Sequence, residues 1–213
     1  SVQKSRELLE KTGARITMVI GEESHNGSRA EYAETWKDSG GGALIRQGCH
    51  PLSAMLYLKQ VEAKAAGKKV AVDSVVADMT AITPTLTDHQ RRFLHAKPVD
   101  VEDIANVILT FDDGTRGVVT ATDTIVGGVR NSLQVFTTES VYLCQISQSD
   151  QLRLYHDDAS VLEDVYITEK LDNKGGWQYV LLDELLARGY IGEMQDFIDC
   201  IVHGGTPQSD FEL

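Results

Sequence analysis

Apolar and polar positions in the first part of the chain predict a helix, a strand and a loop, in that order. Residues 2–12 place an apolar pair among polar positions and stop at Gly13, which predicts a short helix with a glycine cap. Residues 15–23 alternate apolar and polar side chains, which is the period of a strand. Residues 24–39 show no period, and we expect a loop in which Trp36 is an anchor.

The next stretch predicts a long helix followed by a strand. Residues 50–66 combine apolar positions with helix formers, and Pro51 suits a first helical turn because its missing N–H costs nothing there. Gly67 is expected to end this helix. Residues 70–81 are rich in β-formers and predict a strand, whereas residues 82–99 hold two prolines and a basic cluster and predict a loop that leaves the sheet.

The centre of the chain predicts two hairpins. Residues 103–111 and 116–126 are rich in β-formers and flank an Asp-Gly pair at 113–114. This pair is a strong hairpin signal, because glycine adopts positive φ without strain. Residues 132–137 and 140–146 form a second pair of strands with a tight connection between them.

The last third predicts short strands and one clear helix. Residues 152–156 and 161–168 are expected to be strands, and residues 177–189 fit no single pattern. Residues 191–203 place apolar side chains at helical spacing, and Gly204 is expected to end that helix. Because helices do not alternate with strands, the predicted class is α+β: one large, mainly antiparallel open sheet with helices on one face.

Composition limits the function. The chain has 213 residues, of which 42% are hydrophobic, so it can form one large domain with a sizeable core. Its formal charge of −12 argues against nucleic acid as a partner, since phosphate binding needs a basic field. No apolar run approaches the roughly 18 residues of a membrane span, so no membrane partner is expected. The polar first residues and three cysteines without a CxxC motif predict a cytoplasmic protein.

The most informative segment is GGGALIRQGCHP, at residues 40–51. The sequence holds no GxGxxG, P-loop, GxSxG or HExxH motif. In this segment three glycines let the backbone come close to a ligand or to another chain, and Arg46 and His50 lie four positions apart, so that on a helical turn they face the same way. The pattern predicts a ligand site, although an N-cap histidine beside a tight glycine turn explains it as well.

Four segments carry a family resemblance. GGGALIRQGCHPLSAMLYL resembles the signature of the glucose-fructose oxidoreductase, inositol dehydrogenase and rhizopine catabolism (Gfo/Idh/MocA) family. RITMVIGEESHNGSRAEY resembles its first strand and substrate loop, VEDIANVILTFDDGTRGVVTATDT its central hairpin, and EMQDFIDCIVHGGTPQSD its late helix. The resemblance covers residues 5–212 and is to the family's C-terminal domain. It implies the fold of the glyceraldehyde-3-phosphate dehydrogenase-like C-terminal domains.

The resemblance also implies part of a larger enzyme. Residues 1–13 resemble the helix that leaves an N-terminal Rossmann domain, and residues 14–213 resemble the substrate-binding and dimerisation domain, which we expect to be truncated at its C-terminus. NAD or NADP would bind to the Rossmann domain, so this chain alone is expected to bind no cofactor and to be inactive. The implied function is hydride transfer to or from a sugar, polyol or related hydroxy compound. A sheet with one open face predicts a homodimer or higher oligomer.

Individual residues acquire roles from the resemblance. His50 matches the family histidine that accepts the alcohol proton, a task suited to a pKa near neutrality. The family places Asp four residues earlier, where this sequence has Arg46, which is no base and favours a negative group on the ligand. The loop after the first strand offers donors for sugar hydroxyls and an aromatic side chain for a sugar face. The candidate substrate-binding residues are Arg46, His25, Asn26, Arg29 and Trp36.

Two alternative interpretations stay open. Arg46 in place of the family Asp is also what a non-catalytic dimerisation or ligand-sensing sheet domain could carry. A metal-dependent hydrolase that uses His25 and His50 is the third hypothesis, with less support because neither histidine belongs to a metal-binding motif.

Overall fold

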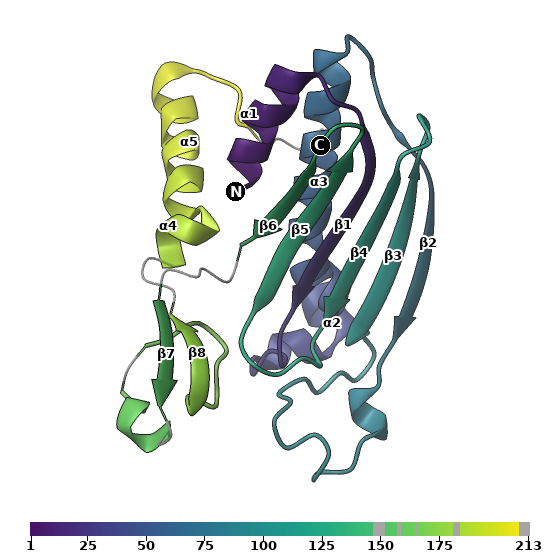
Figure 1. Ribbon diagram of the computed structural model, residues 1–213. Coiled ribbons are helices and arrows are strands. Elements are labelled where there is room, and N and C mark those ends of the chain that lie inside the picture. Colours follow the sequence, from purple (N-terminus) through teal and green to yellow (C-terminus); the bar gives the residue numbers. More distant parts are fainter. Residues whose placement is uncertain (147–151, 157–158, 165, 181–183, 209–213) are drawn as a thin grey trace.

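A computed structural model describes residues 1–146, 152–156, 159–164, 166–180 and 184–208. Its main feature is a six-stranded sheet in the order β2-β3-β4-β1-β5-β6 (Figure 1). The strands are β1 (Ile16–Ser24), β2 (Val72–Thr80), β3 (Ile104–Phe111), β4 (Arg116–Thr122), β5 (Arg130–Thr137) and β6 (Val141–Gln145).

The sheet is mainly antiparallel, as the sequence predicts. Only the contact between β1 and β4 is parallel within this sheet; β2–β3, β3–β4, β1–β5 and β5–β6 are antiparallel. Both predicted hairpins form, and Gly114 takes a φ of 91° in the turn between β3 and β4. β1 lies between the two hairpins, so its carboxyl end is flanked by residues of β4 and β5.

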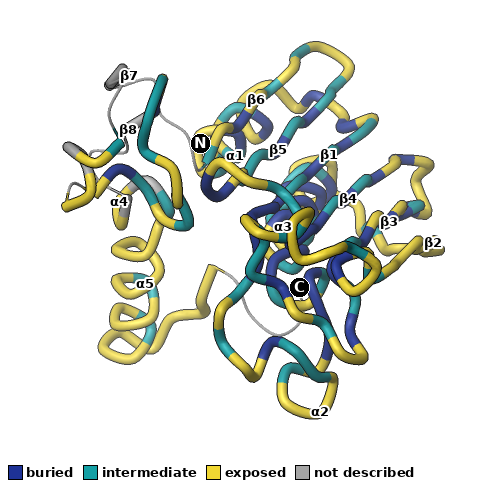
Figure 2. The backbone as a smooth tube through the Cα atoms, turned by 90° about the horizontal axis from the view of Figure 1, so that it is seen from below, coloured by how far each residue is buried: buried dark blue, intermediate teal, exposed yellow. Residues whose placement is uncertain are grey.

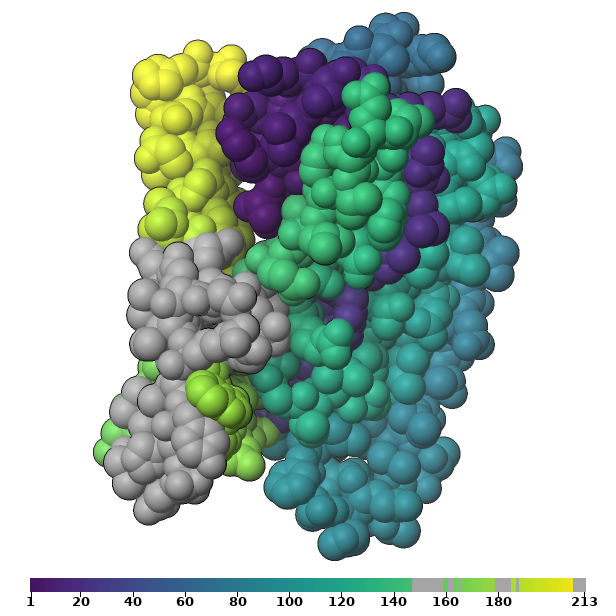
Figure 3. Space-filling model, viewed as in Figure 1, coloured from purple at the N-terminus to yellow at the C-terminus, as the bar shows by residue number. Residues whose placement is uncertain are grey.

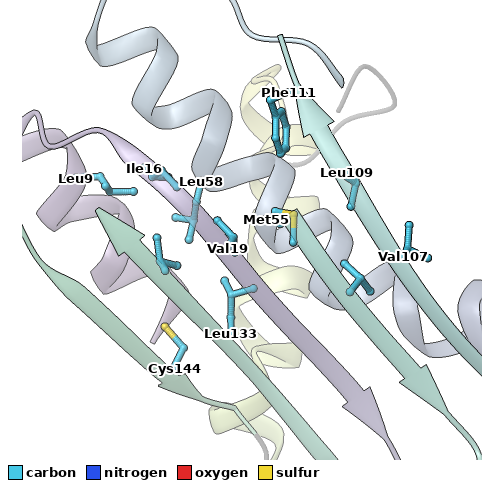
Figure 4. Close-up of a cluster of buried hydrophobic side chains, with 12 residues drawn as sticks. Leu9, Ile16, Val19, Met55, Leu58, Val107, Leu109, Phe111, Leu133 and Cys144 are labelled. Atoms are coloured by element: carbon cyan, nitrogen blue, oxygen red, sulfur yellow. The ribbon is translucent and has the colours of Figure 1, made fainter. Parts of the chain in front are cut away.

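Two helices cover one face of the sheet and enclose the core with it (Figure 4). α1 (Val2–Thr12) ends at Gly13, whose φ of 66° permits a left-handed cap. α3 (Cys49–Ala65) starts one residue before the predicted position, with Pro51 in its first turn. The buried cluster consists of Leu9, Ile16, Val19, Met55, Leu58, Val107, Leu109, Phe111, Val119, Leu133, Val135 and Cys144.

A buried lysine fixes α3 against the turn between β3 and β4. Lys59 is only 1% exposed, and its Nζ donates to Asp113 Oδ2 at 2.7 Å, to Thr115 Oγ1 at 3.0 Å and to the Glu62 carboxylate. Burial by itself raises the pKa of Asp113, but hydrogen bonds from Lys59 and Thr115 outweigh it and lower this pKa to about 2. The buried cation is therefore paired, which its removal from water requires.

The opposite face of the sheet carries a row of apolar side chains. Val76 is paired with Ile108 and Ile108 with Val118, and Ile20 is in register with Val118. On β5 the polar Gln134 interrupts the row, and Leu143 follows it on β6. Directly paired residues of antiparallel strands share a face. Val76, Ile108 and Leu143 are exposed, and Figure 3 looks onto this face.

One predicted strand is wrong. Residues 161–168 form no strand among their described positions; residue 165 lies outside the described residues. Instead η4 (Ala159–Leu162) is a short 3-10 helix. Ile167 is buried, with 1% of its surface exposed, whereas its neighbours Tyr166 and Thr168 are not buried. A short apolar run does not by itself determine the secondary structure. Here the buried Ile167 side chain anchors a connecting segment instead of belonging to a strand.

The stretch that fitted no pattern contains a strand and a helix. β7 (Leu152–His156) pairs with β8 (Gly176–Val180) in a separate two-stranded sheet. α4 (Glu184–Arg188) follows within the same unassigned stretch, whose residues 181–183 lie outside the described residues. Neither element is longer than five residues, which is too short for periodicity to distinguish helix from strand.

α5 (Tyr190–His203) forms as predicted, but its apolar side chains do not join the core. No α5 residue is buried, and Figure 2 shows the helix beside the sheet with an exposed surface. Its large apolar side chains are 48–68% exposed: Tyr190, Ile191, Met194, Phe197, Ile198, Ile201 and Val202. Within the described part of the chain, no helix has the length and apolar character needed to cross a membrane.

The region expected to be a loop contains η1 (Glu31–Glu34) and α2 (Trp36–Ser39), and the glycine run follows. Gly42 lies against Glu102: the Glu102 carboxylate accepts hydrogen bonds from the N–H groups of Gly42 and Leu44, both at 2.9 Å. A Cβ on Gly42 would lie 1.8 Å from the Glu102 carbonyl oxygen. The glycine run therefore permits a close approach to another segment of the same domain.

Replacing Gly42 by Ala is expected to destabilise the fold. The added Cβ has to displace backbone at Glu102. Overpacking of this kind lowers the free energy of unfolding by about 1–3 kcal/mol. Urea denaturation of the purified protein measures the loss. Gly192→Ala is the matched control, because no atom lies within 4 Å of its Cβ position and its φ is not positive. Equal stability of the two variants would contradict the described contact.

Candidate functional site

A cavity of about 570 Å³ opens where β1 ends and α3 begins. Of the candidate residues from the sequence, His25, Arg46 and His50 line this cavity, so the fold brings these three together. Its walls also include Glu23, Tyr32, Gln47, Cys49, Asn131 and Lys170. The cavity thus combines titratable groups from β1, the start of α3 and the segment before β8.

Glu23 and His50 line the cavity as a hydrogen-bonded pair. His50 Nδ1 lies 2.8 Å from Glu23 Oε2, and Asn131 Nδ2 donates to the same oxygen. The register places Asn131 of β5 directly opposite Glu23 of β1. Gly21 allows α3 to come this close, because a Cβ there would lie 2.7 Å from Pro51 Cβ. The pair therefore depends on the contact between β1 and the first turn of α3.

The environment of His50 favours its charged form. Hydrogen bonds with the Cys49 and Glu23 side chains, in this order, raise the pKa of His50 from 6.5 to about 10. The Glu23 carboxylate is buried, whereas 59% of the His50 side chain is exposed. Because the pKa is raised in the folded state, this pairing stabilises the fold below pH 6.5 and the contribution is lost as the pH rises through about 10.

Arg46 is paired within the protein. It lies in η2 (Leu44–Gly48), a single π-helical turn directly before α3. Its guanidinium binds Asp123 Oδ2, and Gln47 Nε2 donates to Asp123 Oδ1 at 2.6 Å. Burial raises the pKa of Asp123, and the charge of Arg46 opposes this rise. Arg46 is thus an internal counter-ion, although its Nε and Gln47 Oε1 are buried and have no hydrogen-bond partner among the described residues.

His25 is neutral at pH 7. Burial, followed by the charges of Lys170, Arg46 and Arg188, lowers its pKa to about 4. Its Nδ1 accepts a hydrogen bond from Gly27 N–H at 2.9 Å, so the proton of the neutral ring is on Nε2. The distance of 3.5 Å between Nδ1 and Asp123 Oδ1 is therefore no ion pair.

Asn26 and Arg29 bind another part of the chain. Asn26 Nδ2 donates to Asp172 Oδ2 at 2.5 Å, Arg29 donates to Asp172 Oδ1 at 3.1 Å, and His95 Nε2 lies 2.9 Å from Asp172 Oδ2. Neither Asn26 nor Arg29 lines the cavity around His50. Trp36 does not line it either; it is 60% exposed on α2, and the aromatic side chain at the cavity is that of Tyr32.

Glu23 and Asp123 are not among the site residues predicted from the sequence. Glu23 is part of an acidic pair at the end of a predicted strand, but the alternation of Ile16, Met18 and Ile20 continues to Glu22. In the structure the register shifts between Ile16 and Met18, and Glu23 is the buried member of the pair. Nothing in the sequence joins Asp123 to Arg46, because the two lie 77 positions apart.

The arrangement suits proton exchange with a small polar ligand. A histidine oriented by a buried carboxylate can act as a general acid or base. Within the described ranges, no group of three or more His, Cys, Asp or Glu residues could hold a metal ion. The residues fit a carbinol or carbonyl group, whereas the phosphate-binding glycine motif that a dinucleotide needs is not in the sequence.

The family model that matches the chain gives its class. Residues 3–142 match the GFO/IDH/MocA C-terminal domain. The chain therefore belongs to this oxidoreductase family and represents its C-terminal domain, which confirms the resemblance seen in the sequence. A comparison with curated proteins gives no match.

Solved structures share the fold. GenD2 from gentamicin A biosynthesis, in complex with NAD, has a TM-score of 0.72 at 20% identity, covering 96% of this chain and 51% of that one. The myo-inositol 2-dehydrogenase from Lactobacillus plantarum has a TM-score of 0.66 at 12% identity, covering 100% and 54%. A probable dehydrogenase from Thermotoga maritima has 0.61 at 20% identity, covering 97% and 52%. The chain thus spans about half the length of these proteins.

Proposed function

We propose that the chain is the substrate-binding half of an NAD(P)-dependent oxidoreductase that acts on a sugar, polyol or related hydroxy compound. The observation that carries this proposal is the hydrogen bond between His50 and the buried carboxylate of Glu23, both of which line the cavity. Membership of the GFO/IDH/MocA family supports it, as does the similarity of the fold to GenD2 in complex with NAD and to a myo-inositol 2-dehydrogenase.

His50 moves the proton in this proposal. The nicotinamide, when bound, supplies or accepts the hydride at the reacting carbon. In carbonyl reduction His50 gives a proton to the oxygen of the carbonyl group, and in alcohol oxidation it takes that proton back. With Nδ1 bonded to Glu23, Nε2 is the atom that faces the substrate oxygen. The raised pKa keeps His50 protonated near pH 7, which favours the reductive direction.

The proposed partners follow from two uncovered apolar surfaces. The exposed apolar side chains of α5 support packing against the rest of the protein, which we take to be an N-terminal Rossmann domain that binds NAD or NADP. The open face of the sheet, with Val76, Ile108 and Leu143, supports a homodimer or higher oligomer. Three free cysteines fit a reducing compartment such as the cytoplasm.

Turnover of the full-length protein tests the proposal. Purified protein is assayed with NAD and with NADP against a panel of polyols, sugars and sugar acids, in both directions, while nicotinamide absorbance is recorded. We expect turnover with at least one pair, and none with residues 1–213 alone. A full-length protein that turns over no member of the panel would favour the alternative, a non-catalytic ligand-sensing domain.

A further inference from the structure

A short segment before β8 forms one wall of the cavity and is firmly anchored. Ile167 is buried at one end, and Asp172 at the other end accepts hydrogen bonds from Asn26 and Arg29 and contacts His95. Between them, Glu169 forms an ion pair of 3.2 Å with Arg188 of α4. The loop donors that the sequence assigned to sugar hydroxyls therefore hold this segment in place.

Lys170 lies at the centre of this segment in an unusual backbone conformation. Its φ of 64° makes it the one non-glycine residue with positive φ in the described part of the chain. Lysine gains nothing from this region by itself, and such residues persist where the surrounding contacts enforce them. The anchors on both sides supply that enforcement. Lys170 lines the same cavity as His25 and His50.

The charges around the cavity single out Lys170. Arg46 is paired with Asp123, Arg188 with Glu169 and His50 with Glu23. Lys170 has no carboxylate partner within the described ranges, although it is half-buried. The remaining carboxylate at the cavity is Glu193, which is exposed on α5.

The influence of Lys170 also reaches into the cavity. Its charge is the largest electrostatic contribution, after burial, to the lowered pKa of His25. An anionic ligand in the cavity would give the ammonium group of Lys170 a charged hydrogen-bond partner.

We propose that Lys170 binds an anionic group of the substrate, so that the preferred substrate is a hydroxy or oxo compound carrying a carboxylate or phosphate group. The description of the ligand as a substrate rests on the proposed oxidoreductase function, whereas the binding of an anion by Lys170 does not depend on it. The sequence predicted that Arg46 binds the negative group of the ligand, but Arg46 is already paired with Asp123. In this proposal Lys170 takes that role.

Matched ligands test the proposal on the full-length protein. Polyols of several configurations are compared with the aldonate and the phosphate ester of each, by calorimetric titration and, where turnover occurs, by kcat and KM. The wild type is expected to bind at least one anionic member about 10- to 100-fold more tightly than its neutral counterpart, since a hydrogen bond to a charged group contributes this much. The aldonate and phosphate arms show which anion is recognised.

Variants at position 170 assign the effect. Lys170→Met is expected to remove the preference for the anion, with a raised KM and a much smaller change in kcat, and Lys170→Arg is expected to retain part of it. Lys174→Met is the control, because Lys174 follows on the same segment, its Nζ donates to the Glu163 carbonyl at 2.7 Å and it does not line the cavity.

Three outcomes would overturn the assignment: no ligand binds, the wild type shows no preference for anions, or the preference survives Lys170→Met. Anion-selective binding that depends on Lys170 but is not accompanied by turnover would uphold the assignment and reject the proposed oxidoreductase activity.

Discussion

His50→Ala is expected to lower kcat/KM of the full-length enzyme by about 10²–10⁴-fold, the usual contribution of a positioned general acid or base. The variant also loses the stabilising contact with Glu23, so a lower unfolding midpoint is expected, but the side chain is more than half exposed and its removal leaves no core cavity. Steady-state rates with the best substrate of the panel measure the effect, and a cooperative unfolding transition well above the assay temperature is the control for folding. A His50→Ala enzyme with wild-type kcat/KM would exclude His50 from proton transfer.

The pH profile separates a positioning role of Glu23 from a structural one. Glu23→Gln keeps the shape and the hydrogen bond but removes the negative charge that helps to raise the pKa of His50 to about 10. In the reductive direction the rate falls when His50 loses its proton. The alkaline limb of kcat/KM is therefore expected to move to lower pH in this variant. A limb that stays in place would show that Glu23 does not control the protonation of His50.

Arg46→Asp is expected to lower the free energy of unfolding by about 3–5 kcal/mol, the cost of leaving a buried charge without its partner. The substitution introduces the residue that the resemblance implies at this position, and it places a second carboxylate against Asp123, whose side chain is only 3% exposed. Chemical denaturation of the purified variant measures the loss.

A second substitution tests the cause of that loss. Asp123→Asn in the Arg46→Asp background removes the repulsion between the two carboxylates and is expected to recover a large part of the stability. If the double variant is no more stable than Arg46→Asp, the damage does not come from the charge of Asp123. Independent sites would give additive losses, so the deviation from additivity measures the coupling.

Much of the fold was predictable because its elements carry their own local signals. The alternation of β1, the Asp-Gly turn at 113–114 and the glycine after α1 depend on the period of the side chains and on backbone φ. Prediction was wrong at residues 161–168, where one buried side chain, Ile167, replaces an alternating strand.

The candidate site was predictable only in part. The sequence identified His25, Arg46 and His50, which all line one cavity. It could not identify their partners, since Asp123 and Arg46 lie 77 positions apart and Glu23 and His50 lie 27 apart. It also assigned Asn26 and Arg29 to the ligand, whereas they bind Asp172.

The sequence by itself determined the α+β class, the family and the position of His50 at the start of a long helix, because these depend on local periodicity and on short motifs. The tertiary structure alone decided that Arg46 is neutralised by Asp123, that His50 is charged beside Glu23 and that Lys170 remains unpaired at the cavity among the described residues. The physical reason is that electrostatic interactions depend on distance and burial in space. Distance and burial of these groups are set only when the chain folds and β1 lies between the β3–β4 and β5–β6 hairpins.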